Sequence, residues 1–162
     1  MTGMLIALML ATAAHCGAAD TPEALAEHFI AAVNAKSPEQ QQAIIHPRCF
    51  ASLSAVQKQF LEETLARDFR RTVPEQHTVK VSNLDSRSLP FGGMMELEWP
   101  IKPTHQFEIE FSTDKYSSTS IIRFIVKEKN EWFIIVPMLN AENLKHYEER
   151  KKSQPVASPG KK

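Results

Sequence analysis

The spacing of apolar residues changes at Pro74, and this change constrains the fold more than any other feature of the sequence. Between Thr21 and Phe69 the apolar side chains recur every three or four residues, which is typical of helices with one buried side. From His77 onward they alternate with polar residues or run together, which is typical of strands. Helices followed by a series of strands predict an α+β domain with an antiparallel sheet.

The first half contains three predicted helices. Thr21-Pro22-Glu23 supplies a capping hydroxyl, a proline in the first turn and an acid, and Ser37-Pro38 repeats the pattern. The second helix is expected to stop before Pro47. The third is expected from about residue 54 to 69. Its buried side is predicted to carry Val56, Phe60 and Phe69, widened by Leu61 and Leu65.

The second half contains strand-like segments at residues 77–84, 95–99, 107–111, 118–127 and 132–136. Residues 95–99 and 107–111 alternate strictly, so we expect each to have one buried face and one face in water. The last two segments are apolar on both faces, as strands covered on both sides are. Lys129-Asn130-Glu131 is interpreted as the short hairpin connection between them.

The two apolar faces of these last strands predict an interface. One face is expected to contain Ile122, Phe124, Ile134 and Val136. The other is expected to contain Ile121, Ile125, Phe133 and Ile135. The N-terminal helices can cover only one face, and large exposed apolar patches rarely go unused, so the second set predicts a homodimer or partner contact. The alternative is that the C-terminal helix covers that face within one chain.

Residues 1–19 predict a signal peptide, and therefore export to the periplasm or the extracellular space. Residues 4–14 are uncharged and mostly apolar, but too short for the roughly 20 residues that span a bilayer. Small residues at 17–19 precede Asp20 and suit cleavage there. Lipid attachment at Cys16 is not favoured, because His15 stands where such signals carry a small residue. Cys49 would then be the single cysteine of the mature domain, and we interpret it as a packing residue rather than a nucleophile.

One domain over residues 20–139 is predicted, followed by a polar helix at 140–152 and a disordered basic tail at 153–162. The chain balances 19 basic against 19 acidic residues, so no overall charge favours nucleic acid. The histidines are scattered and no phosphate-binding loop is present, so the sequence suggests neither a metal site nor a cofactor.

The order of helices and strands resembles the NTF2-like family. The residues that carry the resemblance are Phe29 to Asn34 at the end of the first helix, Ile44 to Pro47 after the second, and Trp132 to Ile135 in the final strand. The resemblance covers about residues 21–139. It implies a curved antiparallel sheet that wraps around the N-terminal helices to form a cone. The family includes small isomerases, dehydratases and hydrolases as well as members that only bind or dimerise, so the fold does not decide the function.

Within such a cone, the residues expected to line a ligand pocket are His28, Trp99, His105, Phe107, Ile109 and Phe111. Trp99 and the apolar residues of 107–111 would form an apolar wall without a buried carboxylate. Asp68 lies beside several arginines in the sequence, so we interpret it as a surface ion pair rather than a tuned base.

These features favour a non-catalytic binding or accessory module over an enzyme. Its cone would hold a small apolar ligand or pack shut. One alternative is an acid–base enzyme built around His105 or His28. The other is an envelope interaction protein that uses its basic tail.

Overall fold

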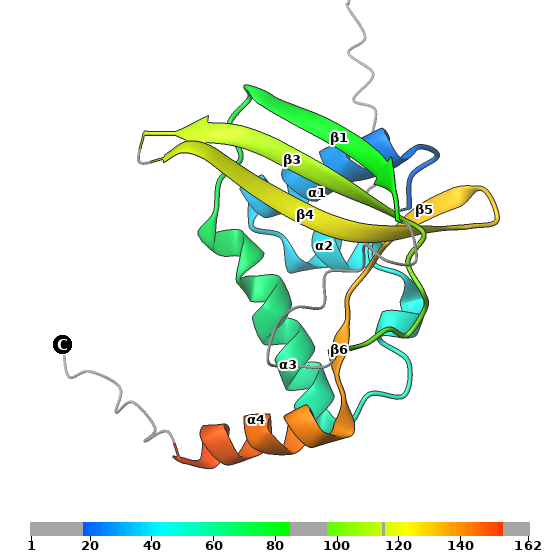
Figure 1. Cartoon of the computed structure of the whole chain (residues 1–162), viewed down its shortest axis with the longest axis vertical. Coiled ribbons are helices and arrows are strands. Elements are labelled where there is room, and N and C mark those ends of the chain that lie inside the picture. The colour runs from blue at the N-terminus through cyan, green and yellow to red at the C-terminus, as the bar shows by residue number, and fades with distance from the viewer. Residues whose placement is uncertain (1–17, 85–96, 115, 154–162) are drawn as a thin grey trace, which may run out of the picture.

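The structure is a computed structural model that describes residues 18–84, 97–114 and 116–153 (Figure 1). The predicted signal peptide, apart from Ala18 and Ala19, lies outside the described residues, as do residues 95–96 and most of the predicted tail. The helices are α1 (Pro22–Ala35), α2 (Pro38–Ala43), α3 (Ala55–Ala66) and α4 (Ala141–Ser153), with short 3₁₀ helices η1 (Pro47–Cys49) and η2 (Asp68–Arg70). The strands are β1 (His77–Asn83), β2 (Leu97–Glu98), β3 (His105–Thr113), β4 (Tyr116–Glu128), β5 (Glu131–Ile135) and β6 (Met138–Leu139). The predicted α+β class is confirmed.

The helix starts follow the local sequence signals. The Thr21 hydroxyl accepts a hydrogen bond from the backbone N–H of Ala24, and Ser37 and Ser54 cap α2 and α3 in the same way. α1 ends where Lys36 adopts a left-handed conformation, with φ at 52°. Its N–H then bonds to the carbonyls that α1 leaves open at its C-terminal end.

The third helix is shorter than predicted, because α3 ends at Ala66 and the chain continues into η2. The prediction of its buried side is confirmed only in part. Leu61 and Leu65 are buried, whereas the three residues expected to mark that side, Val56, Phe60 and Phe69, are only partly buried. Phe69 lies in η2, where the turn of the backbone no longer follows the α-helical period.

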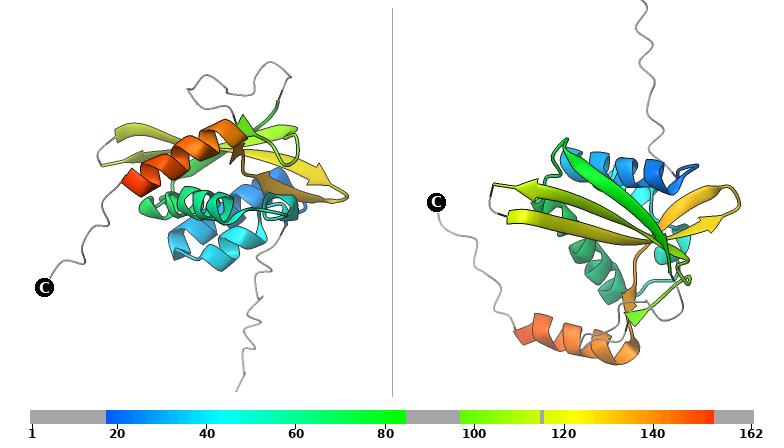
Figure 2. Two further views of the ribbon diagram at one scale, coloured as in Figure 1. Left: turned by 90° about the horizontal axis from the view of Figure 1, so that it is seen from below. Right: turned by 45° about the horizontal axis from the view of Figure 1, so that its top comes forward.

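The main sheet is antiparallel, with strand order β1-β3-β4-β5. β2 and β6 form a separate two-stranded pair in which Leu97 opposes Leu139. The turn between β4 and β5 is tight, with Lys129 at a φ of 57°. Figure 2 shows α1, α2 and α3 on one side of the main sheet, while α4 lies beyond it against α3.

The register of β4 and β5 corrects the predicted faces. Because Glu128 opposes Glu131 across the turn, Ile125 opposes Ile134, and Phe124 opposes Ile135. Opposed residues of an antiparallel pair lie on the same face. Ile134 therefore shares a face with Ile121 and Ile125, and Ile135 shares the other with Phe124. The error arose because alternation within a strand does not show which residue of the next strand lies opposite.

Three of the four residues predicted to form an interface, Ile121, Ile125 and Ile135, are buried within the chain, and Phe133 is partly buried. The C-terminal helix does not cover the face that contains Phe124 and Ile135 either. α4 packs against α3 and β6, at the far end from the sheet (Figure 1). Other segments cover part of this face. The Trp99 ring lies 5.1 Å from the Phe124 ring, and the His46 ring lies 5.1 Å from that of Phe133.

The outer edge of β5 is covered by two segments from the N-terminal part of the chain. Ala19 exchanges two backbone hydrogen bonds with Trp132. Ile134 donates to the carbonyl of Ile44 and accepts from the N–H of His46, at 2.9 Å each. Covering an edge in this way removes a row of donors and acceptors that would otherwise pair with other chains. It also fixes His46 at the end of the sheet.

Candidate functional site

The predicted ligand pocket is filled by side chains. Phe107 and Ile109 of β3 are fully buried, and Phe111 is 7% exposed. These residues face α1, whose Phe29 ring lies 6.0 Å from the Phe107 ring. Phe29 therefore occupies the space between helix and sheet in which an apolar ligand was expected.

Trp99 does not join this apolar wall. Its ring packs edge-on against Phe124, and the position opposite Phe124 in β3 is Gln106. Gln106 points to the face opposite Phe107, so Trp99 and Phe107 lie on different sides of the sheet. The prediction of one wall was wrong because Trp99 follows β2, which pairs with β6 rather than with β3. Matching alternation in unpaired strands does not define a common face.

The two histidines predicted for the pocket are only partly buried. The Nδ1 atom of His105 lies 2.9 Å from the hydroxyl oxygen of Thr104, and its ring packs edge-on against Trp132 at 4.8 Å. These contacts position the ring without a carboxylate, the partner that most often orients a histidine base. His28 is partly buried on α1.

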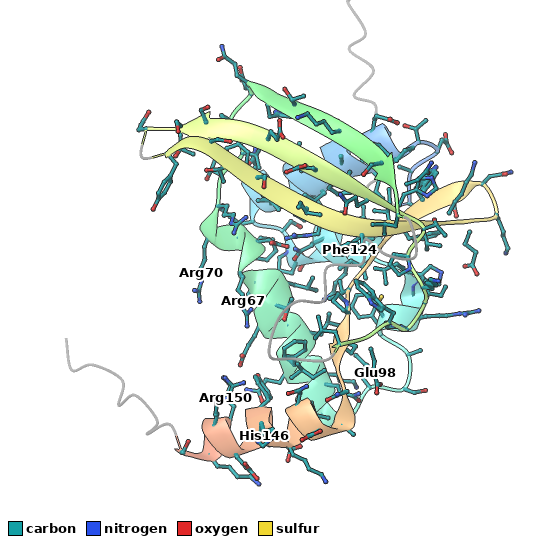
Figure 3. All side chains as sticks on the ribbon, viewed as in Figure 1. Arg67, Arg70, Glu98, Phe124, His146 and Arg150 are labelled. Carbon is teal, nitrogen blue, oxygen red and sulfur yellow. The ribbon has the colours of Figure 1, made fainter. Side chains whose placement is uncertain are left out.

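Asp68 forms a buried cluster that corrects the prediction of a surface ion pair. Its side chain bonds to the guanidinium of Arg123 in β4 and accepts a hydrogen bond of 2.9 Å from Gln41 in α2. Asp68 is 7% exposed, whereas its sequence neighbours Arg67 and Arg70 project outward from the end of α3 (Figure 3).

Arg123 extends this cluster toward α1. Its guanidinium lies 4.8 Å from the centre of the Phe29 ring. The ion pair and the cation–π contact together tie α1, α2, η2 and β4 to one another. The carboxylate of Asp68 is therefore engaged in holding the fold.

His46 forms a second buried polar site at the end of the sheet. Its Nδ1 accepts the backbone N–H of Arg48 at 3.1 Å and so caps η1, while its Nε2 lies 2.9 Å from a carboxylate oxygen of Glu128. The neighbouring Cys49 is fully buried, and this burial raises the pKa of its thiol. A raised pKa disfavours the reactive thiolate, which supports the interpretation of Cys49 as a packing residue.

His77 forms a third polar site, where β1 begins. Its Nδ1 lies 2.9 Å from the carbonyl oxygen of Pro74, and its Nε2 lies 3.1 Å from a carboxylate oxygen of Glu27 in α1. The Pro74 carbonyl, and then the Glu27 carboxylate, raise the pKa of His77 above its ordinary value of 6.5. Both partners accept hydrogen bonds, so the ring is best satisfied when both nitrogens carry a proton.

The segment that leads into His77, residues 71–76, lies along α1, and we call it the connector. The side chain of Asn34 donates to the carbonyl of Val73 at 2.8 Å and accepts the N–H of Val73 at 2.9 Å. The Lys36 ammonium also bonds to the carbonyl of Arg71. The connector is thus held to α1 at its beginning by Lys36, in its middle by Asn34 and at its end by the contact of His77 with Glu27.

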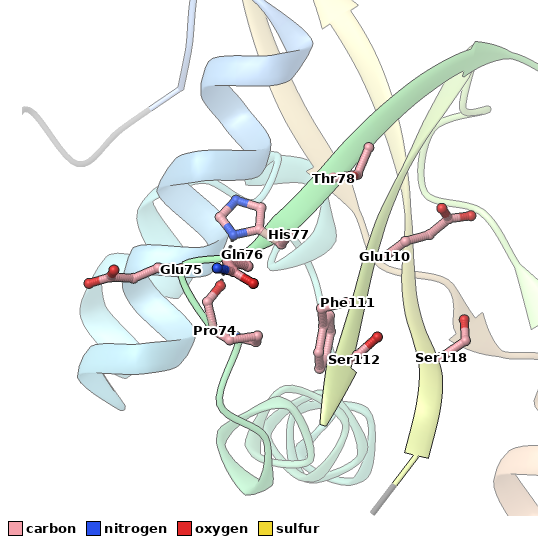
Figure 4. Close-up of a pocket in the computed structure, with 9 residues that line it drawn as sticks. All are labelled: Pro74, Glu75, Gln76, His77, Thr78, Glu110, Phe111, Ser112 and Ser118. Atoms are coloured by element: carbon pink, nitrogen blue, oxygen red, sulfur yellow. Dashed lines mark hydrogen bonds between the residues drawn. The ribbon is translucent and has the colours of Figure 1, made fainter. Parts of the chain in front are cut away.

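The connector forms one wall of an open depression of about 860 Å³ at the end of the sheet (Figure 4). Pro74 to Thr78 line one side, and Glu110 to Ser112 with Ser118 line the other. Among the described residues, the lining contains the hydroxyls of Thr78, Ser112 and Ser118, the carboxylates of Glu75 and Glu110, an amide and the imidazole of His77. The hydroxyl and carboxylate oxygens can accept hydrogen bonds.

Sequence reasoning missed all three polar sites. His46 is separated from Glu128 by 82 residues, Asp68 from Arg123 by 55, and His77 from Glu27 by 50. Alternation and capping are local signals, and no local signal pairs residues so far apart. The only available cue was the position of His46 directly before Pro47, which is typical of a residue that caps a turn.

Within the described ranges, no group of three or more His, Cys, Asp or Glu side chains is placed to hold a metal ion. In the same ranges, no helix combines the length and apolar character needed to cross a membrane. Comparison of the chain with protein-family models, curated proteins and solved structures gives no match.

Proposed function

We propose that this chain is an exported, non-catalytic binding or accessory module with an NTF2-like arrangement, and that it acts through its surface rather than through an internal cavity. The observation that carries the proposal is the filled space between α1 and the sheet. Phe29, Phe107, Ile109 and Ile121 are each no more than 2% exposed. Export is supported by the apolar run at residues 4–14.

The filled interior argues against retention of an apolar ligand. Protein interiors are packed as tightly as organic crystals, and a ligand of several carbon atoms needs a cavity that such packing does not contain. Of the two forms of binding module, the one whose cone is packed shut agrees better with these contacts.

Two of the three polar sites, those of Asp68 and His46, offer no base for an acid–base enzyme. Asp68 is engaged by Arg123 and Gln41, and His46 caps a turn within the buried part of the chain. A general base must reach a proton on a substrate, and both side chains are almost entirely shielded from solvent. They stabilise the fold instead.

The depression beside the connector is the surface at which we place partner binding. It is open to solvent, it lies at the end of the sheet, and its lining offers hydroxyl and carboxylate oxygens. The partner class that fits is a polar molecule or peptide segment rich in hydrogen-bond donors.

The closed interior can be tested with benzene as a small apolar probe. We expect the melting temperature of the wild-type protein to be unchanged by saturating benzene, because the probe has no cavity to enter. The variant Phe107→Ala should lose about 3–5 kcal/mol of stability and regain part of it in benzene, which occupies dry engineered cavities.

Phe107→Leu serves as the milder variant if Phe107→Ala does not fold, and its smaller cavity should give a smaller response to benzene. Calorimetry with and without the probe provides the measurement. A rise in the wild-type melting temperature with benzene would show an open apolar cavity and would overturn the surface-binding proposal.

A further inference from the structure

We propose that the contact between His77 and Glu27 is a pH-sensitive latch, which holds the connector against α1 and so sets the shape of one wall of the depression. The role given to the depression rests on the proposed function. The latch itself is a contact between described residues and can be tested without any ligand.

The hydrogen bonds of the His77 ring favour its charged form. Its two nitrogens face the carbonyl of Pro74 and the carboxylate of Glu27, and neither of these groups can donate a hydrogen bond. A neutral imidazole carries a single proton and satisfies only one of the two. The side chain of His77 is 15% exposed, so water does not easily replace the lost partner.

The connector depends on this contact at its C-terminal end. Asn34 and Lys36 hold its first half to α1 through Val73 and Arg71. Pro74 follows, and proline has no backbone N–H with which to make a further tether. The described contact that joins the second half of the connector to α1 is the one made by His77 and Glu27. Loss of the second ring proton therefore releases either the Pro74 carbonyl or the Glu27 carboxylate.

One charged group acts on the His77 ring at close range. α1 contributes the carboxylate of Glu27, with Glu23 one turn farther away, and the connector contributes the backbone carbonyl of Glu75. From β3, the residue opposite His77 is the uncharged Phe111. The adjacent Glu110 points to the other face, where it bonds to Lys80 at 2.6 Å. Glu27 is therefore the charged group that favours the protonated ring, while the Lys80 ammonium is engaged by Glu110 on the other face.

The direction of the pH dependence follows from the sign of the shift. The pKa of His77 is raised above 6.5 in the folded protein, first by the Pro74 carbonyl and then by Glu27. A raised pKa means that the folded state holds the proton more tightly than the unfolded chain does. The stabilisation is complete below pH 6.5 and is lost as the pH rises through the folded pKa. The latch is closed below pH 6.5 and opens as the pH rises through the folded pKa of His77.

The test compares melting temperatures at pH 5.5 and pH 8.5 for the wild type and three variants. His77→Gln and Glu27→Gln should melt about 2–4 °C below the wild type at pH 5.5 and close to it at pH 8.5. Glu23→Gln is the matched control, because it removes the same charge from the same helix without a contact to His77. Its difference from the wild type should be the same at both pH values.

Hydrogen exchange at the Val73 amide, which Asn34 holds, reports whether opening of the latch loosens the rest of the connector. Its protection, corrected for the intrinsic rate at each pH, should fall several-fold between pH 5.5 and 8.5 in the wild type and stay level in Glu27→Gln. If His77→Gln does not fold, Glu27→Gln carries the test. The proposal is overturned if Glu27→Gln and Glu23→Gln behave alike at both pH values, or if Val73 protection does not change. Neither result depends on whether the wild type admits benzene.

Discussion

His46 and His77 form two similar contacts with opposite hydrogen-bonding requirements. Each ring lies at one end of the sheet and meets a glutamate from a distant part of the chain, Glu128 for His46 and Glu27 for His77. His46 accepts a backbone N–H on Nδ1, so a single proton on Nε2 satisfies both nitrogens. His77 faces an acceptor on each side and needs two protons.

The difference shows that the backbone group in contact with Nδ1 decides whether one ring proton or two satisfy the hydrogen bonds of a histidine. The two glutamates are alike in chemistry and both are exposed. The second contact is an N–H from Arg48 in one site and a carbonyl from Pro74 in the other. Nδ1 of His46 therefore acts as an acceptor, whereas Nδ1 of His77 acts as a donor. One histidine therefore serves as a fixed part of the fold, and the other as a group that responds to pH.

The largest effect is expected when the fixed histidine is removed. His46→Ala should reduce the free energy of unfolding by about 2–4 kcal/mol, because it deletes a ring that is 2% exposed and leaves the N–H of Arg48 without its acceptor. Chemical denaturation at pH 7 provides the measurement.

His46→Asn is the matched variant for this site. Its amide oxygen occupies about the position of Nδ1 and can still cap η1, so part of the stability should return. A loss of less than about 1 kcal/mol in His46→Ala would contradict the assignment of His46 as a fixed part of the fold.

The sequence predicted those elements whose signals are local. The helix starts at Thr21 and Ser37 were predicted from capping residues that act within one turn, and the structure confirms them. The strands around residues 107–111 and 132–136 were predicted from their own alternation or apolar runs. The end of α3 was not predicted, because no proline or glycine marks the change to η2 at Asp68.

The candidate sites could not be predicted because they depend on how separate elements meet. The faces of β4 and β5 were assigned wrongly, since register is set by the turn at Lys129 and not by the pattern within each strand. Asp68 was expected to pair with the arginines beside it. The tertiary fold instead buries it against Arg123, and the arginines of η2 and its flanks point to solvent.

The smallest effect is expected when the glutamate of the fixed site loses its charge. In Glu128→Gln the amide oxygen can still accept the Nε2 proton of His46, and the position is well exposed, so the stability at pH 7 should be unchanged within error. Denaturation beside the wild type checks this. A loss as large as that of His46→Ala would mean that the charge of Glu128, rather than the ring and its backbone partner, holds the site together.

Nuclear magnetic resonance of the imidazole nitrogens tests the contrast between the two histidines most directly. At pH 8 the account predicts that His46 carries its proton on Nε2, with Nδ1 as an acceptor. In a titration, the midpoint of His77 should lie above 6.5 and should move toward that value in Glu27→Gln. A His77 midpoint at or below 6.5, or a His46 proton on Nδ1, would contradict the account.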